Sequence, residues 1–248
     1  MLALPLYDDS PRSTIPLVTV TLIAACVLVF LWQFGLPARQ AHEVVLRYGM
    51  IPAVLFGHAE LPPQLHPVPA WATLFTSMFL HGGWLHLVGN MIYLWIFGKG
   101  VESALGPARF LLLYLISGAA AGLTQGAIDP VSTAPMIGAS GAIAGTLGAY
   151  LLLHPRGNVV VFVWFFVFVR FITVPALILL GLWFLLQLLS ALAPGESGVA
   201  FWAHVGGFIA GMLLVPFLRR PGTPMLQPAR STSFSVSRRG APRRGPWG

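Results

Sequence analysis

Long apolar runs separated by short polar connections dominate this 248-residue sequence and limit what it can fold into. About 20 helical residues cross the hydrocarbon core of a bilayer. Six runs are candidates for such spans, at about 16–34, 85–101, 110–128, 140–153, 174–192 and 200–218. Only 8% of the residues are charged, against about 25% in a soluble domain. Lipid is therefore the natural solvent, and the sequence predicts an all-α membrane protein built as a six-helix bundle.

The segments outside these runs divide the chain. Residues 1–14 are predicted to be a cytoplasmic N-terminal segment, and residues 15–218 the six-helix domain. Within that domain, residues 35–84 are too polar to span and make a long first outer loop. Residues 159–171 are apolar but short, and we interpret them as an interfacial or re-entrant piece. Residues 219–248, rich in Ser, Pro, Gly and Arg, are predicted to be a disordered basic tail drawn to anionic lipid.

Basic residues are unevenly distributed among the connections, and this predicts the orientation. Cytoplasmic connections carry an excess of Lys and Arg. The connections 129–139 and 193–199 contain neither, whereas the opposite side carries Lys99, Arg109, Arg156, Arg170 and seven arginines beyond Leu218. Both termini are therefore predicted to be cytoplasmic, in an integral multi-pass protein of the bacterial inner membrane. The net charge of +7 does not indicate nucleic acid, because half of the basic residues lie in the tail.

Four polar side chains interrupt the apolar runs at one predicted level. A polar group in hydrocarbon is costly unless it is paired or wetted, so such residues mark functional sites. His86 and Asn90 lie early in the second run, Ser140 begins the fourth, and His204 lies early in the sixth. These three helices are predicted to start on the outer side, and His86 and Asn90, four residues apart, point the same way. The four groups predict a wet cavity just below the outer face.

Ser140 and His204 are suited to nucleophilic catalysis. Ser140 lies in Gly138-Ala139-Ser140-Gly141, where glycine allows a tight turn and free N–H groups at a helix N-terminus can stabilise an oxyanion. A serine hydroxyl needs a neighbouring base, and His204 is the candidate. Because no acidic residue lies within the six runs, a Ser–His dyad is a simpler reading than a triad.

Three stretches carry a resemblance to a known family. Residues 81–90 (HGGWLHLVGN), 138–141 (GASG) and 203–207 (AHVGG) resemble the rhomboid intramembrane serine proteases in residue type, spacing and order. The resemblance covers roughly residues 10–218. It implies an enzyme that hydrolyses peptide bonds of transmembrane substrates near the outer membrane face, within the lipid bilayer. It implies no cofactor, no metal and no nucleic acid.

The resemblance also implies a role for each site residue. Ser140 would be the nucleophile and His204 the general base. His86, Asn90 and the Ser140 backbone N–H would form the oxyanion hole. His81 would help to hold the first outer loop, and the glycines on either side of the Ala-Ser pair would support the turn.

Three further positions matter for this comparison. Glu102 resembles an acidic residue that ends the second helix in the family, and the fifth run, with Trp183, resembles a mobile helix past which substrates enter. Many members have an aromatic residue beneath the base where this chain has Ala144. The sequence therefore assigns no residue that orients the His204 ring.

Other classes of function predict different features. A lone intramembrane serine is more often a helix-packing hydroxyl, and glycines four apart are ordinary packing motifs. An inactive relative that escorts membrane clients would lack the serine or the histidine, and both are present. A transporter would show internal repeats and broken helices, which the sequence lacks. A metalloprotease would need a carboxylate beside His81, His86 and His204, and none is near them.

Overall fold

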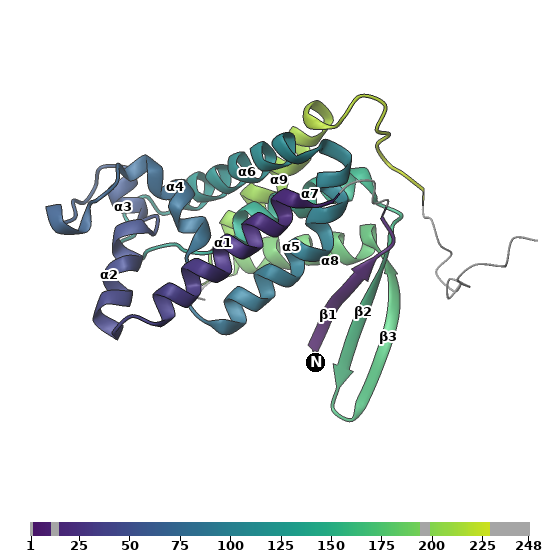
Figure 1. The fold of residues 1–248 in the computed structure, drawn as a ribbon, viewed down its shortest axis with the longest axis horizontal. Helices are drawn as coiled ribbons and strands as arrows, with labels where there is room; N and C mark the ends of the chain where they lie inside the picture. Colours follow the sequence, from purple (N-terminus) through teal and green to yellow (C-terminus); the bar gives the residue numbers. More distant parts are fainter. Residues whose placement is uncertain (1, 11–14, 194–198, 229–248) are drawn as a thin grey trace, which may run out of the picture.

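The protein is a bundle of long helices, described by a computed structural model for residues 2–10, 15–193 and 199–228 (Figure 1). The bundle consists of α1 (Leu17–Phe34), α5 (Trp84–Leu105), α6 (Pro107–Ile128), α7 (Ser140–Leu153), α8 (Ala176–Leu192) and α9 (Phe201–Leu218). Helices α5, α7 and α9 begin at one end of the bundle, which we call the Ser140 end. Helices α1, α6 and α8 begin at the opposite end.

The helix lengths confirm part of the predicted membrane architecture. Within the described residues, α1, α6 and α9 are long and apolar enough to cross a membrane by length and composition, and α7 and α8 are shorter apolar helices. Helix α5 has 22 residues but carries Lys99 and Glu102. A mostly helical fold is therefore confirmed, three of its described helices are long and apolar enough to cross a membrane, and the number of six crossings stays a prediction.

The segment between α1 and α5 forms short helices at the Ser140 end. They are α2 (Ala38–Tyr48), α3 (Pro52–Leu55), η1 (Pro63–Leu65), η2 (Ala70–Ala72), α4 (Thr73–Thr76) and η3 (Ser77–Phe79). This segment holds the chain that leads into α7, because Met50 and Met136 form a β-bridge. In addition, the Gly138 N–H donates to the Ser77 carbonyl at 2.9 Å.

Helix α7 lies at the centre of the bundle and packs against α5, α6, α8 and α9. Its contact with α9 is a backbone contact: a Cβ built on Gly211 would lie 2.5 Å from the carbonyl carbon of Gly145. Because lipid gives little hydrophobic drive for helix association, close approach through small residues stabilises such a pair. The glycines that the sequence places on both helices therefore fix the distance between them.

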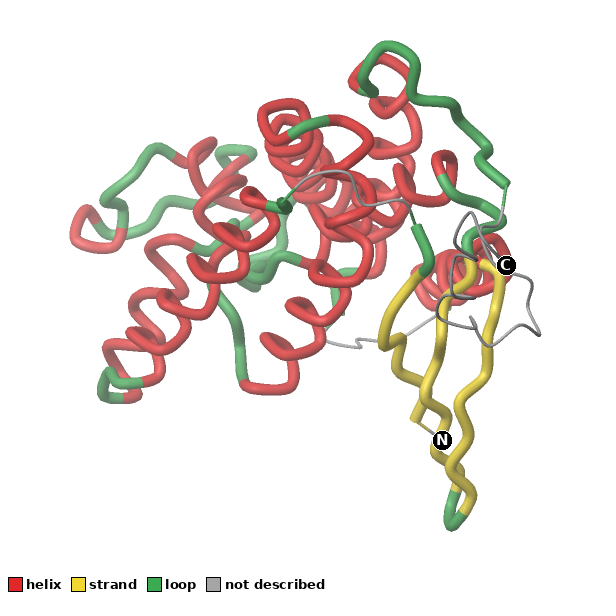
Figure 2. The backbone as a smooth tube through the Cα atoms, turned by 45° about the vertical axis from the view of Figure 1, so that its right-hand side comes forward, coloured by secondary structure: helices red, strands yellow, loops and turns green. Residues whose placement is uncertain are grey.

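A three-stranded antiparallel sheet makes the all-α prediction wrong for part of the chain. Strands β1 (Leu2–Asp8), β2 (Asn158–Phe165) and β3 (Phe168–Pro175) pair in the order β1-β2-β3. Residues 159–171 thus form most of a hairpin, in keeping with the β-branched and aromatic residues of this segment. The sheet lies at the end opposite Ser140, and its hairpin turn projects beyond the bundle (Figures 1 and 2).

Glu102 joins α5 to the start of α1. Its carboxylate accepts hydrogen bonds from the backbone N–H groups of Val18 and Thr19 at 2.9 and 2.8 Å, and from the Thr19 hydroxyl at 2.7 Å. The two backbone N–H groups are donors that the first turn of α1 leaves without an intrahelical partner, and α1 has no side-chain cap of its own. A buried carboxylate is thus satisfied by a helix N-terminus.

Candidate active site

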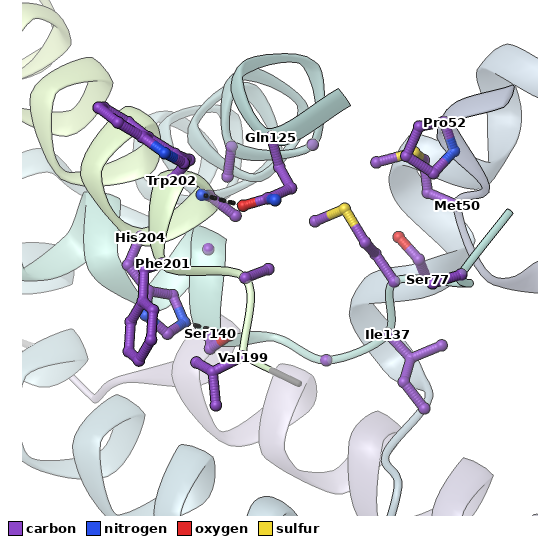
Figure 3. A pocket seen from close by; sticks show the side chains of 18 of the residues that line it. Met50, Pro52, Ser77, Gln125, Ile137, Ser140, Val199, Phe201, Trp202 and His204 are labelled. Carbon is purple, nitrogen blue, oxygen red and sulfur yellow. Dashed lines mark hydrogen bonds between the residues drawn. The ribbon is translucent and has the colours of Figure 1, made fainter. Parts of the chain in front are cut away.

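Ser140 and His204 meet at the Ser140 end of the bundle. Ser140 is the first residue of α7, and His204 lies in the first turn of α9. The His204 Nε2 and the Ser140 Oγ are 2.9 Å apart (Figure 3), which is hydrogen-bond distance for a hydroxyl and an imidazole. The arrangement allows the imidazole to accept the hydroxyl proton.

Gly138 shapes the turn before Ser140. Its φ of +121° lies in a region that residues with a Cβ rarely adopt. A Cβ on Gly138 would also lie 2.6 Å from the His86 Nε2. The glycine is therefore required both by the backbone conformation and by the close packing of His86 against the turn. In this way the loop before α7 brings His86 of α5 next to Ser140.

Asn90 contributes a buried donor without a partner. The side chain is 8% exposed, and its Nδ2 has no hydrogen-bond acceptor among the described residues. A buried polar group without a partner costs about 1–3 kcal/mol, so this amide is available to donate a hydrogen bond to a water or another acceptor in the site. The position of Asn90 near Gly138 places this donor beside the turn that precedes Ser140.

His81 and His86 lie together just before and within the start of α5. Their ring centroids are 5.2 Å apart in an edge-to-face arrangement. His81 is 1% exposed, and its Nδ1–H donates to the Phe79 carbonyl at 3.3 Å. Burial, and secondly the charge that His86 can carry, lower the pKa of His81 to about 4, against the opposing effect of the Phe79 hydrogen bond. His81 is therefore a neutral residue that packs the loop.

A cavity of about 870 Å³ opens beside the Ser–His pair. It is lined by His86 and by residues of α6, α8 and α9. Ser140, Gln125 and His204 lie around it in Figure 3. Gln125 of α6 also lines it and accepts a hydrogen bond from the Ala203 N–H at 3.3 Å. The volume falls in the range of about 300–1,000 Å³ that small-ligand sites occupy.

Gln187 of α8 is a site residue that the sequence reasoning missed. Its Oε1 lies 2.7 Å from the His204 Nδ1, on the side of the ring away from Ser140. Trp183, also on α8, lies with its ring centroid 6.0 Å from that of His204. The sequence does carry a signal, because Gln187 and Ser190 are the only polar residues of α8. No spacing rule, however, connects Gln187 to His204.

A metal centre finds no support in the described part of the chain. No group of three or more His, Cys, Asp or Glu side chains in residues 2–10, 15–193 and 199–228 is placed to hold a metal ion. His81 and His86 are adjacent to each other, but no carboxylate joins them. The chemistry available at the cavity is that of a hydroxyl, an imidazole and amide donors.

Comparison with known proteins places most of the helical bundle in one family. The Rhomboid domain family model matches residues 69–221, more than half of the chain. RHOMBOID-like protein 1 of Arabidopsis thaliana is 30% identical over 199 residues, which cover 80% of this chain and 47% of that protein. YdcA of Bacillus subtilis is 35% identical over 134 residues (54% of this chain, 61% of YdcA). Rhomboid protease GluP of the same organism is 43% identical over 81 residues (33% and 15%). The chain thus spans less than two thirds of the length of these relatives.

Proposed function

This chain belongs to the rhomboid family, and on that premise we propose that it is an intramembrane serine endopeptidase. The observation that carries the proposal is the 2.9 Å contact between the His204 Nε2 and the Ser140 Oγ at the edge of a large cavity. A packing serine would need neither a histidine at this distance nor a cavity. The Asn90 Nδ2, which has no hydrogen-bond partner among the described residues, adds a buried amide donor beside them.

The proposed reaction uses Ser140 and His204 as a dyad. The Ser140 Oγ attacks the carbonyl carbon of the scissile peptide bond while the His204 Nε2 accepts the hydroxyl proton. The resulting oxyanion is held by Asn90, by His86 and by the free N–H of Ser140 at the start of α7. His204 then returns the proton to the leaving amine. Water, activated by the same imidazole, hydrolyses the acyl-enzyme and restores the serine.

The proposed substrates are transmembrane segments of other proteins. The cavity lies at the Ser140 end, where α5, α7 and α9 begin, and we place this end on the outer side of a membrane crossed six times, with both termini in the cytoplasm. A substrate helix enters from the lipid and unwinds near the outer face. Residues that break or weaken a helix favour cleavage, because a helical peptide bond is buried in its own hydrogen bonds.

Cleavage of a transmembrane reporter by the purified, membrane-reconstituted protein tests the proposal. Ser140→Ala is expected to abolish cleavage without unfolding the bundle. A matched control is Thr21→Ala, which removes a hydroxyl that is exposed on α1 and bonded only to its own helix, and it should cut at the wild-type rate. Cleavage by Ser140→Ala at that same rate would overturn the assignment of the nucleophile.

The roles of the polar residues can be separated by the rate at which a serine-reactive phosphonate labels Ser140. His204→Ala is expected to remove both labelling and cleavage. Asn90→Ala and His86→Ala should slow cleavage by about 10²–10³-fold, as for other oxyanion donors, and still allow slow labelling. If His86→Ala abolishes labelling while His204→Ala preserves it, the base has been wrongly assigned.

A further inference from the structure

The ring of His204 is held from a neighbouring helix, α8. Gln187 is the polar contact, at 2.7 Å from Nδ1, and Trp183 lies against the ring. On α7, Ala144 is fully buried and offers only a methyl group. The contacts that orient the imidazole therefore come from α8 and not from the helix that carries the nucleophile.

With its amide oxygen facing the ring, Gln187 matches one tautomer of His204. An amide oxygen can only accept, so the Nδ1 that faces it carries the proton. In a neutral imidazole the Nε2 then has its lone pair free, and this lone pair points at the Ser140 hydroxyl 2.9 Å away. That is the tautomer in which histidine can act as a general base towards serine. In serine proteases of the triad type, an aspartate at this Nδ1–H performs the same orientation.

From this geometry we propose that Gln187 is the positioning residue of the catalytic base, in the place that a carboxylate occupies in a Ser–His–Asp triad. The proposal rests on the proteolytic function proposed above. Gln187 touches neither substrate nor nucleophile and acts only through the orientation and tautomer of His204. A neutral amide in this place avoids the cost of an ionised carboxylate inside the membrane, which accords with the absence of acidic residues from α8.

The location of Gln187 also makes the active site depend on how α8 packs. The residues of α8 that are buried, Ala176 and Leu180, lie in its first half. The half that carries Gln187 contacts α9 through aromatic rings, with Phe184 stacked on Phe208 at 4.6 Å. A displacement of this half from α9 removes the hydrogen bond to Nδ1. The base is therefore oriented only while α8 lies against α9.

Two substitutions of Gln187 test the proposal. Gln187→Leu keeps the size but removes the acceptor, and we expect kcat to fall about 10-fold or more with little change in KM. The imidazole becomes charged when it accepts the serine proton, and a hydrogen bond to a charged group contributes more than the roughly 1.4 kcal/mol that corresponds to a factor of ten in rate. Gln187→Glu keeps an oxygen facing Nδ1 and should retain activity within about 3-fold of wild type. In Gln187→Glu the acid limb of the pH–rate profile should move to higher pH, because a carboxylate beside the ring favours the protonated imidazole. The control is Leu186→Ala, an exposed neighbour on the same helix.

The results distinguish this proposal from that of the function itself. A wild-type kcat in Gln187→Leu would overturn the positioning role. An equal loss of kcat in Gln187→Leu and Gln187→Glu would overturn it too, because that result indicates only a packing defect. Ser140→Ala is measured beside them. If Ser140→Ala still cuts, the proposed function fails. If cleavage depends on Ser140 but not on Gln187, only the present inference fails.

A second, independent inference concerns the sheet at the opposite end of the bundle. The β2–β3 hairpin presents an apolar surface that the helices do not cover, formed by Trp164, Phe166, Val167, Phe168, Val169, Phe171 and Ile172. Its single charged residue is Arg170. An exposed apolar surface of this kind on a hairpin that extends into water would favour aggregation. Something of apolar character therefore covers it.

The position of the hairpin indicates what covers it. Strand β3 ends at Pro175, and α8 begins at the next residue. Leu177 and Ile178 at the start of α8 are exposed, so the apolar surface of the hairpin continues into the lipid-facing surface of α8. The sheet runs across the end of the helices (Figures 1 and 2). We infer that the hairpin lies in the boundary between lipid headgroups and acyl chains. Aromatic rings favour this region, and its polar groups can satisfy the free edge of β3.

Spin labels on single cysteines in lipid nanodiscs test the location of the hairpin. A label at Phe168→Cys is expected to collide more often with oxygen, which concentrates in lipid, than with a water-soluble nickel chelate. The native Cys26 is fully buried, and a label at Arg39→Cys, whose side chain is 91% exposed, is the aqueous control. The inference is overturned if the nickel chelate reaches the label at position 168 as readily as the label at position 39. It is also overturned if neither agent reaches the label at position 168 because a second copy of the chain covers it.

Discussion

Substituting Gly207 on α9 by alanine should separate Ser140 from His204 while it leaves both side chains intact. Gly207 lies one turn after His204 and packs against Gly141, the residue that follows Ser140. A Cβ on Gly207 would lie 3.0 Å from the Gly141 carbonyl carbon and closer still to its oxygen. Ordinary carbon contacts are about 3.5–4.0 Å, so α9 must move away from α7 by roughly 1 Å.

The expected loss of activity follows from that displacement. A shift of about 1 Å takes the 2.9 Å contact between the His204 Nε2 and the Ser140 Oγ beyond hydrogen-bond range. A misplacement of this size costs about 100-fold in rate, and overpacking of the contact costs about 1–3 kcal/mol of stability. The assay is kcat for reporter cleavage in nanodiscs, with thermal unfolding measured on the same samples.

A glycine on α8 provides the matched control. A Cβ on Gly181 meets nothing within 4 Å, so Gly181→Ala should cut at the wild-type rate and keep or raise stability, since alanine favours helix over glycine. If Gly207→Ala cleaves as fast as Gly181→Ala and melts at the wild-type temperature, backbone contact between α7 and α9 does not set the geometry of the dyad.

Three more predictions concern stability and orientation. Glu102→Ala leaves the donors of Val18 and Thr19 unpaired and should cost about 3 kcal/mol or more; a thermal unfolding shift that corresponds to under about 1 kcal/mol would contradict the capping role. Because the folded pKa of His81 is about 4, below its ordinary 6.5, the folded state binds fewer protons than the unfolded state between these values. The free energy of unfolding should therefore fall by up to about 3 kcal/mol as pH drops through this window. Unfolding measured between about pH 4 and 7 checks this, and its pH dependence should be weaker in His81→Gln. An epitope at Gly248 should resist a protease added to intact cells, and its digestion would reverse the proposed orientation.

The sequence alone predicted the candidate residues because their signals are local. Ser140 is recognisable from the glycines around it, and His86 and Asn90 from their spacing on one helix. His204 is recognisable as a polar group in an apolar run. Each of these signals depends on the cost of a polar side chain in lipid or on the conformational freedom of glycine, and both can be read from neighbouring residues. The structure brings the His204 Nε2 to 2.9 Å from the Ser140 Oγ, and the catalytic roles of the predicted residues stay with the proposal.

Only the tertiary structure decided which distant segments meet. Strand β1 pairs with β2 across about 150 residues of chain, so no local pattern at residues 2–8 could predict the sheet. Gln187 reaches His204 because α8 packs against α9 at one particular rotation, and an apolar sequence does not specify that rotation. The separation of α7 and α9 depends on which glycines face each other. Such pairings depend on backbone approach between elements far apart in sequence, and they are determined only when the whole bundle has packed.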